Sequence, residues 1–237
     1  HLAIKAGVPV QPAAENVSAE DPEVLLKAAE SVGYPLLVKA SAGGGGIGLK
    51  PVFSPSELVE AVAGTQRMAE RAFGDGTVFL EKLIESARHI EVQVFGFGNG
   101  EAVHLFERDC SIQRRYQKVL EESPAPNVPQ EVLAHMANAA VNLAKLCRYD
   151  GAGTVEFLYD DKSQSYFFLE MNTRIQVEHP VTEAVTGVDL VEAQIRHALG
   201  EDVEGELTQQ SIQRNGHAIE ARLYAESPEK KVMPVPG

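Results

Sequence analysis

The chain has 237 residues, 44% of them apolar and 23% charged, which suits one large or two small globular domains with a hydrophobic core. Its formal charge of −13 at pH 7 leaves no broad basic surface, which excludes general binding to nucleic acid. The chain also lacks a membrane-length apolar run and a signal-peptide pattern, so we expect a soluble intracellular protein without a membrane partner. Cys110 and Cys147 are expected to be buried free thiols.

The first third of the chain predicts two helices and two short strands. One helix begins near Asp21 and stops at Gly33, and a short apolar strand covers residues 34–39. Residues 54–57 resemble a capping box with Pro at the first helical position, and they open a helix that runs to about Ala72. Residues 78–80 form the next predicted strand.

The rest of the chain mixes strands and helices without a strict alternating order. Residues 90–95 alternate between apolar and polar types, which predicts a half-buried strand, and a glycine-rich turn connects it to a strand at residues 102–106. Long amphipathic helices are predicted at residues 129–148 and 182–199. This order favours an α+β or mixed α/β class over a doubly wound parallel sheet.

A glycine-rich run follows the strand that ends in Lys39. Residues 43–48 expose bare backbone amides that can wrap phosphate oxygens, and the Lys39 ammonium lies close enough in sequence to reach the same anion. The run is not a Walker A loop, because no Gly-Lys-Ser/Thr follows it. A surface loop without a ligand is the alternative.

Two acids are predicted to lie on a hairpin. The strands at residues 153–159 and 165–171 are joined by a polar turn, and a hairpin symmetric about Ser163 places Glu156 opposite Glu170. Two bare carboxylates on one face repel each other, and a hard divalent cation such as Mg²⁺ or Mn²⁺ removes that repulsion. Two solvated acids at the strand ends are the alternative.

Two further runs are rich in polar chemistry. Asn172, Arg174, Gln176 and Glu178 share one face if the chain is extended, which offers a planar anion a bidentate Arg and a nearby base. Residues 107–118 hold four of the basic residues of this acidic chain, which indicates a local anion site or, alternatively, a salt-bridged surface strand.

With these motifs the chain resembles the biotin carboxylase family of ATP-grasp enzymes over nearly its whole length. The resemblance rests on residues 107–118, 121–126, 170–180 and 216–222. It implies an ATP-grasp fold of the α+β (mixed α/β) class, with a small lid subdomain, a larger antiparallel-sheet subdomain and ATP between them. We place the N-terminal connector and lid at residues 1–83 and the catalytic subdomain at residues 84–237, as a fragment of a longer biotin carboxylase.

The resemblance implies ATP and two Mg²⁺ or Mn²⁺ ions as cofactors. Glu81 would reach the adenine amino group, and His89 would contact the ribose. Glu156 and Glu170 would bind the metal ions with help from Asn172. The full set of implied ATP-binding residues is Lys39, Gly43, Gly44, Gly45, Gly46, Gly48, Glu81, Lys82, Leu83, His89, Gln113 and Tyr116.

The resemblance also implies the biotin carboxylase half-reaction, in which ATP phosphorylates bicarbonate to carboxyphosphate. Carboxyphosphate would break down to CO₂ and phosphate, and the phosphate would take the ureido proton of biotin on a separate carrier domain. Glu178 would be the base on bicarbonate, and Arg222 would stabilise the biotin enolate. The implied bicarbonate and biotin residues are Lys118, Arg174, Gln176, Val177, Glu178 and Arg222.

Three positions point to a branch of the family. Ile47 stands where acyl-CoA and pyruvate carboxylases usually carry Lys or Arg, and Tyr116 stands where they usually carry His. The Ile at this loop position and residues 220–226 look more like urea carboxylase. We therefore favour a urea carboxylase, with an acyl-CoA or pyruvate carboxylase as the alternative. The resemblance implies a biotin carboxyl carrier domain and a carboxyltransferase domain as partners, a homodimer, and a cytoplasmic location, or the mitochondrial matrix for an organellar enzyme.

Two other functions remain open. One is another ATP-grasp ligase, such as a carbamoyl-phosphate synthetase domain, against which Arg222 argues because an ammonia-using enzyme has no enolate to stabilise. The other is a non-catalytic nucleotide-binding module. Because the family has further domains on both sides of this segment, we expect the fragment alone to bind nucleotide poorly and to be inactive.

Overall fold

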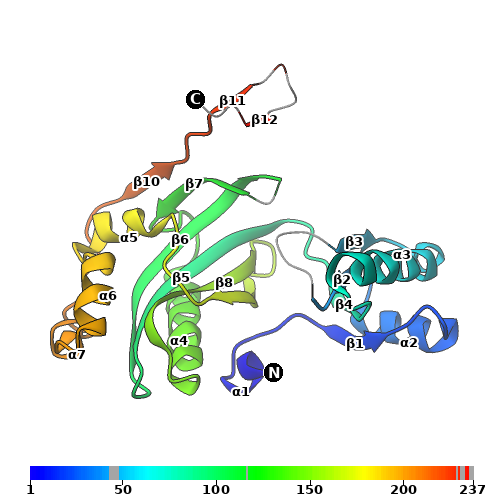
Figure 1. The fold of residues 1–237 in the computed structure, drawn as a ribbon, viewed down its shortest axis with the longest axis horizontal. Coiled ribbons are helices and arrows are strands. Elements are labelled where there is room, and N and C mark those ends of the chain that lie inside the picture. Colours follow the sequence, from blue (N-terminus) through cyan, green and yellow to red (C-terminus); the bar gives the residue numbers. More distant parts are fainter. Residues whose placement is uncertain (43–47, 116, 228, 230–232, 235–237) are drawn as a thin grey trace. The chain divides into compact units, whose positions relative to one another are not determined.

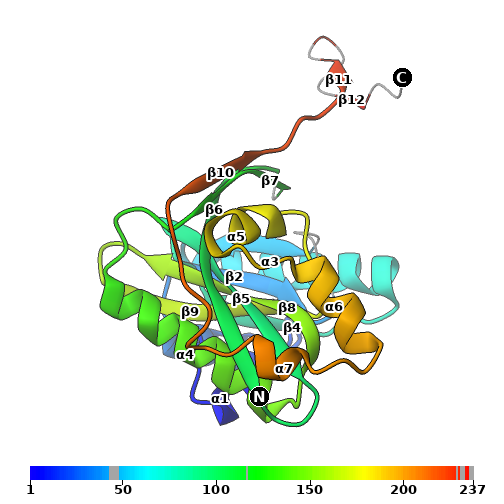
Figure 2. The same cartoon turned by 90° about the vertical axis from the view of Figure 1, so that its left-hand side faces the viewer.

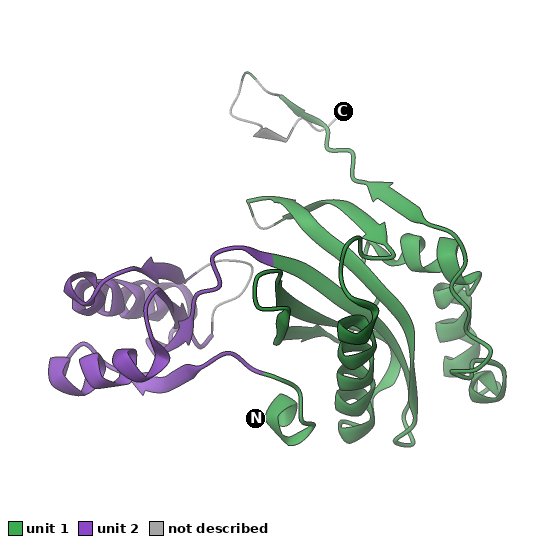
Figure 3. Cartoon of the chain, turned by 180° about the vertical axis from the view of Figure 1, so that it is seen from behind, with its two compact units in different colours: residues 1–9, 88–237 green, residues 10–87 purple. Residues whose placement is uncertain are grey.

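The computed structural model describes residues 1–42, 48–115, 117–227, 229, 233 and 234. The chain divides into two compact units, residues 10–87 and residues 1–9 with 88–237 (Figure 3). The boundary expected from the sequence falls after residue 83 and groups residues 1–9 with the smaller part. Residues 1–9 lie in the larger unit because Ala3 and Val8 pack into its core.

The smaller unit is a four-stranded antiparallel sheet with two helices, its strands ordered β1-β4-β2-β3 (Figure 1). Leu25 and Leu58, from its two helices, are buried with Leu36 of β2 and Leu80 of β4 in one apolar core. Its elements are β1 (Ala13–Val17), α2 (Pro22–Val32), β2 (Leu36–Ala40), β3 (Leu49–Val52), α3 (Pro55–Phe73) and β4 (Val78–Lys82).

The larger unit is built on a six-stranded sheet in the order β10-β7-β6-β5-β8-β9. The pairs β10–β7, β7–β6, β6–β5 and β8–β9 are antiparallel. The sheet strands are β5 (Ala87–Phe97), β6 (Ala102–Arg114), β7 (Gln117–Ser123), β8 (Asp150–Asp160), β9 (Ser165–Asn172) and β10 (Ala218–Ala221). The helices are α1 (Leu2–Lys5), α4 (Gln130–Leu146), α5 (His179–Thr186), α6 (Leu190–Ala198) and α7 (Val203–Glu206), and a short ribbon pairs β11 (Glu226–Ser227) with β12 (Met233–Pro234). The predicted mixed α+β class is confirmed.

The two faces of this sheet carry different side chains. On one face, Ile90 and Val92 of β5 and Val155 of β8 pack against α4, whose Met136 and Ala140 are fully buried (Figure 1). On the other face, α6 and α7 cover an apolar end that includes Phe95 of β5 (Figure 2). The remainder of that second face is polar, and it carries the candidate site.

Two elements differ from the predicted ones. Residues 182–199 form two helices instead of one, because Gly187 adopts φ 74° at the end of α5 and Asp189 caps α6 by accepting a hydrogen bond from the Glu192 amide. Strand β5 is buried on both faces instead of half-buried, since Glu91 and Gln93 are both 0% exposed. Among the described residues, no helix is long and apolar enough to cross a membrane.

Of the two cysteines, Cys110 is a buried free thiol as predicted. Cys147 is exposed at the end of α4, so its predicted burial was wrong.

Candidate active site

A group of charged side chains gathers on the polar face of the six-stranded sheet. Alternation along β5 turns Glu91 to this face, and the same alternation along β8 turns Glu156 to it. We call this group the charged cluster, and it comprises His89, Glu91, Arg108, Lys118, Glu121, Glu156, Glu178 and Arg222.

Lys118 of β7 lies at the centre of the charged cluster. Its Nζ lies 2.5 Å from Glu91 Oε2, 2.8 Å from Glu156 Oε1 and 2.5 Å from Glu178 Oε1. The side chain is only 11% exposed. Burial by itself would lower the pKa of Lys118, but the surrounding carboxylates raise it above its ordinary value, so the ammonium stays charged.

Glu178 connects Lys118 to the edge strand of the sheet. Its second oxygen, Oε2, accepts a hydrogen bond of 2.7 Å from Arg222 Nη2, and Arg222 Nε donates to Glu121 Oε1 at 2.6 Å. Arg222 follows β10 directly, and its backbone amide donates to the Val119 carbonyl. Both oxygens of the buried Glu178 carboxylate therefore contact cations that also face the polar side of the sheet.

His89 sits between two carboxylates at the other end of the charged cluster. Its Nε2 lies 3.2 Å from Glu156 Oε2 and 3.5 Å from Glu91 Oε2. Burial alone would lower the pKa of His89, but its contacts with Glu156 and Glu91 outweigh burial and raise that pKa to about 9. A protonated His89 together with Arg108, Lys118 and Arg222 balances the four carboxylates of the charged cluster.

The same contacts lower the pKa values of the acids. Burial would raise the pKa of Glu91, but Arg108, His89 and Lys118 hold it well below its usual range. Burial likewise opposes ionisation of Glu156, yet His89 and Lys118 lower its pKa. Both groups are therefore carboxylates at neutral pH.

The predicted pairing of Glu156 with Glu170 is confirmed by the register of β8 and β9. Near the turn, however, Asp160 pairs with Ser165, which is one residue out of step with a hairpin symmetric about Ser163. A bulge between Glu156 and Phe157 restores the expected pair.

The side chains at and beside this pair are of the types that bind a hard divalent cation. Asn172 ends β9, and its Nδ2 donates to Glu156 Oε1 at 3.0 Å, while Glu170 is exposed. Two carboxylates and an amide oxygen are donors that Mg²⁺ and Mn²⁺ accept. Among the described residues, one cluster with metal-ligand spacing joins His89, Glu91 and Glu156, and another joins Glu91, Cys110 and Glu178; neither includes Glu170.

The segment after β9 is not extended, so its residues do not share one face as we expected. Gln176 is buried and its Nε2 donates to Glu156 Oε1 at 3.0 Å, which brings it into the charged cluster. Arg174 is exposed and donates to Asn172 Oδ1 at 3.2 Å and to the Ile175 carbonyl. Val177 is 59% exposed.

The basic residues of the 107–118 run separate in space instead of forming one anion site. Arg108 and Lys118 point into the charged cluster, whereas Arg114 pairs with Glu226 at 2.5 Å and Arg115 is exposed. Gln113 Nε2 lies 3.2 Å from His89 Nδ1, so these two predicted nucleotide-binding residues are neighbours. Tyr116 lies outside the described residues.

The smaller unit holds the other predicted ATP-binding residues. Lys39 Nζ binds Glu81 Oε2 at 2.8 Å across the β2–β4 pair. The Lys82 and Leu83 amides donate to the Pro12 and Pro35 carbonyls.

Gly48 closes the β2–β3 hairpin, where its carbonyl accepts a hydrogen bond from the Ala40 amide. Only glycine fits there, because its φ is 86° and an added Cβ would lie 2.8 Å from Ala40 Cβ. The rest of the predicted phosphate loop, at Gly43, Gly44, Gly45, Gly46 and Ile47, lies outside the described residues.

Three members of the charged cluster, Glu91, Arg108 and Glu121, are not among the site residues that the sequence predicts. Arg108 was counted only as part of a basic run, and Glu91 only as the polar side of an alternating strand. A usable signal was present, because Glu91 and Gln93 are polar residues in an otherwise apolar strand.

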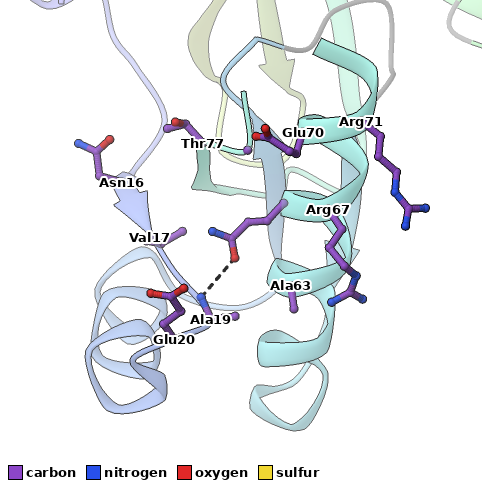
Figure 4. Close-up of a pocket in the computed structure, with 11 residues that line it drawn as sticks. Asn16, Val17, Ala19, Glu20, Ala63, Arg67, Glu70, Arg71 and Thr77 are labelled. Carbon is purple, nitrogen blue, oxygen red and sulfur yellow. Dashed lines mark hydrogen bonds between the residues drawn. The ribbon is translucent and has the colours of Figure 1, made fainter. Parts of the chain in front are cut away.

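A hollow in the smaller unit holds none of the predicted site residues. This open pocket of ≈ 820 Å³ lies between β1 and α3 (Figure 4). Its lining mixes Arg67 and Arg71 with Glu20 and Glu70, which gives it no preference for either sign of charge.

The four-stranded and six-stranded units and their strand order define the class of the protein, an ATP-grasp domain with a biotin carboxylase type of fold. The sequence of residues 1–206 matches the protein family described as carbamoyl-phosphate synthase L chain, ATP binding domain. The chain belongs to that family.

Curated relatives agree with this assignment. The chain is 53% identical over 232 residues to biotin carboxylase 2 of Bacillus subtilis, covering 98% of this chain and 51% of that protein. It is 51% identical to a pyruvate carboxylase subunit of Methanothermobacter thermautotrophicus and 49% identical to the alpha subunit of mitochondrial methylcrotonoyl-CoA carboxylase of Oryza sativa, covering 98% of this chain in both cases and 46% and 31% of those proteins. The chain thus spans about half the length of the first of these relatives.

Solved structures are similar in fold as well. A biotin carboxylase–beta-gamma-ATP complex from Campylobacter jejuni matches with a TM-score of 0.89 and 44% identity, over 98% of this chain and 51% of that chain. The biotin carboxylase domain dimer of Hydrogenobacter thermophilus 2-oxoglutarate carboxylase, in complex with MgADP, ADP and bicarbonate, matches with a TM-score of 0.87 and 45% identity over the same shares.

Proposed function

We propose that the chain is the ATP-binding catalytic part of a biotin carboxylase, which uses ATP and bicarbonate to carboxylate biotin on a carrier domain. The position of Lys118 carries this proposal, since its ammonium is largely buried and lies within 2.8 Å of three carboxylates. A buried cation held beside a possible base is suited to bind a small anion and to activate it.

Bicarbonate enters this arrangement by competing for cations that Glu178 already binds. Lys118 contacts one Glu178 oxygen and Arg222 contacts the other. When bicarbonate takes one of these cations as its counter-ion, the released Glu178 oxygen can accept the bicarbonate proton. The bicarbonate oxygen then forms a bond to the γ-phosphorus of ATP, and the bond from that phosphorus to the β,γ-bridging oxygen breaks to release ADP.

Arg174, Gln176 and Val177 complete the proposed bicarbonate site from the segment after β9. Arg174 is exposed and therefore accessible to an anion, while Gln176 is anchored on Glu156. Arg222 is assigned to the enolate of biotin, where a guanidinium neutralises the charge that develops when the ureido proton leaves.

Glu156, Glu170 and Asn172 are proposed to hold Mg²⁺ or Mn²⁺. The cations would neutralise the phosphate oxygens of ATP during transfer. Lys118 already occupies Glu156 Oε1, so the other oxygen, Oε2, is the one that must leave His89 to bind metal.

Lys39, Gly48, Glu81, Lys82 and Leu83 are proposed to bind the nucleotide, together with His89, Gln113, Tyr116 and the Gly43–Gly46 run. The Lys82 and Leu83 amides already have carbonyl partners within the smaller unit. Their carbonyl oxygens are therefore the groups we assign to the adenine amino group, which donates hydrogen bonds.

The final carboxyl acceptor is a separate question. In the sequence, Ile47 and residues 220–226 favour urea, but the relatives named above are biotin, pyruvate and methylcrotonoyl-CoA carboxylases and give that branch no support. We now favour an acyl-CoA or 2-oxoacid acceptor, with a biotin carrier domain and a carboxyltransferase domain as partners. A homodimer is proposed by analogy with the 2-oxoglutarate carboxylase domain dimer.

A carbamoyl-phosphate synthetase activity is the second candidate, favoured by the family model that matches residues 1–206. It also begins with phosphorylation of bicarbonate. The two reactions differ in the second acceptor, which is ammonia in one and biotin in the other.

The test is ATP hydrolysis by the full-length parent protein with Mg²⁺, measured with and without bicarbonate, free biotin and ammonium. Turnover that requires bicarbonate, rises with biotin and is lost in Glu178→Gln supports the proposal. Stimulation by ammonium instead of biotin would favour the second candidate, and turnover indifferent to bicarbonate would refute both. Glu131→Gln, an exposed acid on α4, is the matched control and should keep full activity.

A further inference from the structure

Arg108 is the most completely buried basic side chain in the charged cluster. It is 0% exposed, although a guanidinium is costly to remove from water unless all its donors are paired. The Arg side chain has five N–H donors, and the structure gives it five acceptors. They are Glu91 Oε1 at 2.6 Å, Gln93 Oε1 at 2.7 Å, Thr182 Oγ1 at 2.9 Å, Thr154 Oγ1 at 3.1 Å and Gln176 Oε1 at 3.4 Å.

These acceptors come from four parts of the larger unit. Glu91 and Gln93 lie on β5, where Glu91 is the direct cross-strand partner of Arg108, and Thr154 lies on β8. Thr182 lies on α5, and Gln176 lies in the segment between β9 and α5. A single side chain therefore connects the sheet, the helix above it and the segment that precedes Glu178.

Two of the acceptors use their second polar atom in the proposed reaction site. Glu91 binds Arg108 with Oε1 and Lys118 with Oε2. Gln176 accepts from Arg108 with Oε1 and donates to Glu156 with Nε2. Arg108 thus contacts the two side chains that bind Lys118 and Glu156, and it is itself fully buried.

We propose that Arg108 is a positioning residue, which fixes Glu91 and Gln176 so that Lys118 and Glu156 are held in the geometry that bicarbonate activation needs. This inference rests on the proposed function. It assigns Arg108 no contact with substrate, because its five donors are used within the protein. The guanidinium fork sets the direction of each hydrogen bond, which an ammonium does not do.

The first test is steady-state kinetics of the full-length parent with Arg108→Lys, which keeps the charge but offers three donors in place of five. We expect kcat for bicarbonate-dependent ATP cleavage to fall by about tenfold to a hundredfold, the range for losing an outer partner of a site residue. The KM for bicarbonate should rise by about tenfold while the KM for ATP changes by less than about threefold, since the proposed nucleotide-binding residues of the smaller unit are not among the five acceptors of Arg108.

Thr182→Val provides a milder variant in case Arg108→Lys does not fold. It removes one acceptor of Arg108 while keeping the shape of the side chain, and Thr186→Val is its matched control on the same helix, because the Thr186 hydroxyl donates to the Thr182 carbonyl and not to Arg108. A rise in the bicarbonate KM with Thr182→Val but not Thr186→Val supports the proposal. Equal kinetics in the two variants, or parallel rises in both KM values, would overturn it.

Hydrogen–deuterium exchange separates this inference from the proposed function. Residues 173–178 should exchange faster in Thr182→Val than in Thr186→Val even if the parent shows no bicarbonate-dependent turnover. If the parent shows no bicarbonate-dependent turnover but the exchange difference between the two variants is present, the result counts against the proposed function alone. If exchange in Thr182→Val equals that in Thr186→Val, the result counts against the role of Arg108.

Discussion

Replacing Lys118 by Met removes the cation that three carboxylates share, while keeping most of the apolar stem. Lys118 Nζ contacts Glu91, Glu156 and Glu178 at 2.5 to 2.8 Å, and its side chain is 11% exposed. Removing one partner from a buried ion pair costs about 3–5 kcal/mol, because the remaining charge is left without compensation. We therefore expect Lys118→Met to lower the free energy of unfolding by about 3–5 kcal/mol at pH 7.

The cost should depend on pH with a definite sign. In the wild type the pKa values of Glu91 and Glu156 are lowered on folding, so their contribution is present above their unfolded pKa and is lost as pH falls through the folded one. In Lys118→Met those carboxylates lose a cation, so their pKa values are higher than in the wild type. As pH falls, they are therefore protonated earlier than in the wild type, and protonation removes the repulsion between them. The stability difference between the two proteins should be largest near pH 7 and should shrink below about pH 4.5.

The assay is urea denaturation followed by far-ultraviolet circular dichroism, since the chain has no Trp. Lys145→Met is the control, because Lys145 pairs with Glu101 at the surface, with side chains 39% and 60% exposed, and should cost at most about 1 kcal/mol. A loss below about 1 kcal/mol for Lys118→Met, or one that is the same at about pH 3.5 as at pH 7, would refute the reasoning.

Two further predictions concern single positions. His89 should release its proton near pH 9, because its neighbouring carboxylates raise its pKa to about 9. The stability that its charge contributes is therefore fully present below about pH 6.5 and is lost as pH rises through about 9. A nuclear magnetic resonance titration of His89 with a midpoint near pH 6.5 would contradict this prediction. Gly96→Ala should cost about 1–3 kcal/mol in the same urea assay, because the new Cβ would lie 2.2 Å from the Tyr149 carbonyl oxygen. Gly64→Ala, in open space on α3, should instead gain up to about 1 kcal/mol, and equal effects of the two substitutions would contradict the steric argument.

Local sequence patterns predicted the elements whose signals are complete within a short window. The helix opened by residues 54–57 runs from Pro55 to Phe73, close to the predicted end at Ala72. The hairpin of β8 and β9 has the predicted Glu156–Glu170 pair. The Pro at the first helical position acts locally, so the sequence alone contains the start of this helix, but the predicted capping box does not form: Ser54 makes no side-chain cap, and Glu57 accepts from the Phe53 amide. The Glu156–Glu170 pair also requires the bulge after Glu156, which the turn sequence does not reveal.

The faces of the long strands were harder to predict, because burial depends on what covers them. Glu91 and Gln93 have the alternation of a solvated face, yet both are fully buried. Arg108 from β6, which donates to both Glu91 and Gln93, and Lys118 from β7, which donates to Glu91, supply the partners that make this burial possible. Neither partner is near β5 in sequence, so a window of residues 90–95 could not reveal it.

The sequence by itself determined the family of this protein, since its acids, cations and glycine-rich run are placed in motifs that resemble one family, and the family match over residues 1–206 agrees. Only the tertiary structure decided which of these groups meet. Phe106 adopts φ 65° within a bulge of β6, where the register with β5 shifts, and the shift pairs Arg108 instead of Glu107 with Glu91. Alternation predicts a face only until a bulge reverses it, and a bulge is stabilised by the long-range packing of the strands and helices around it.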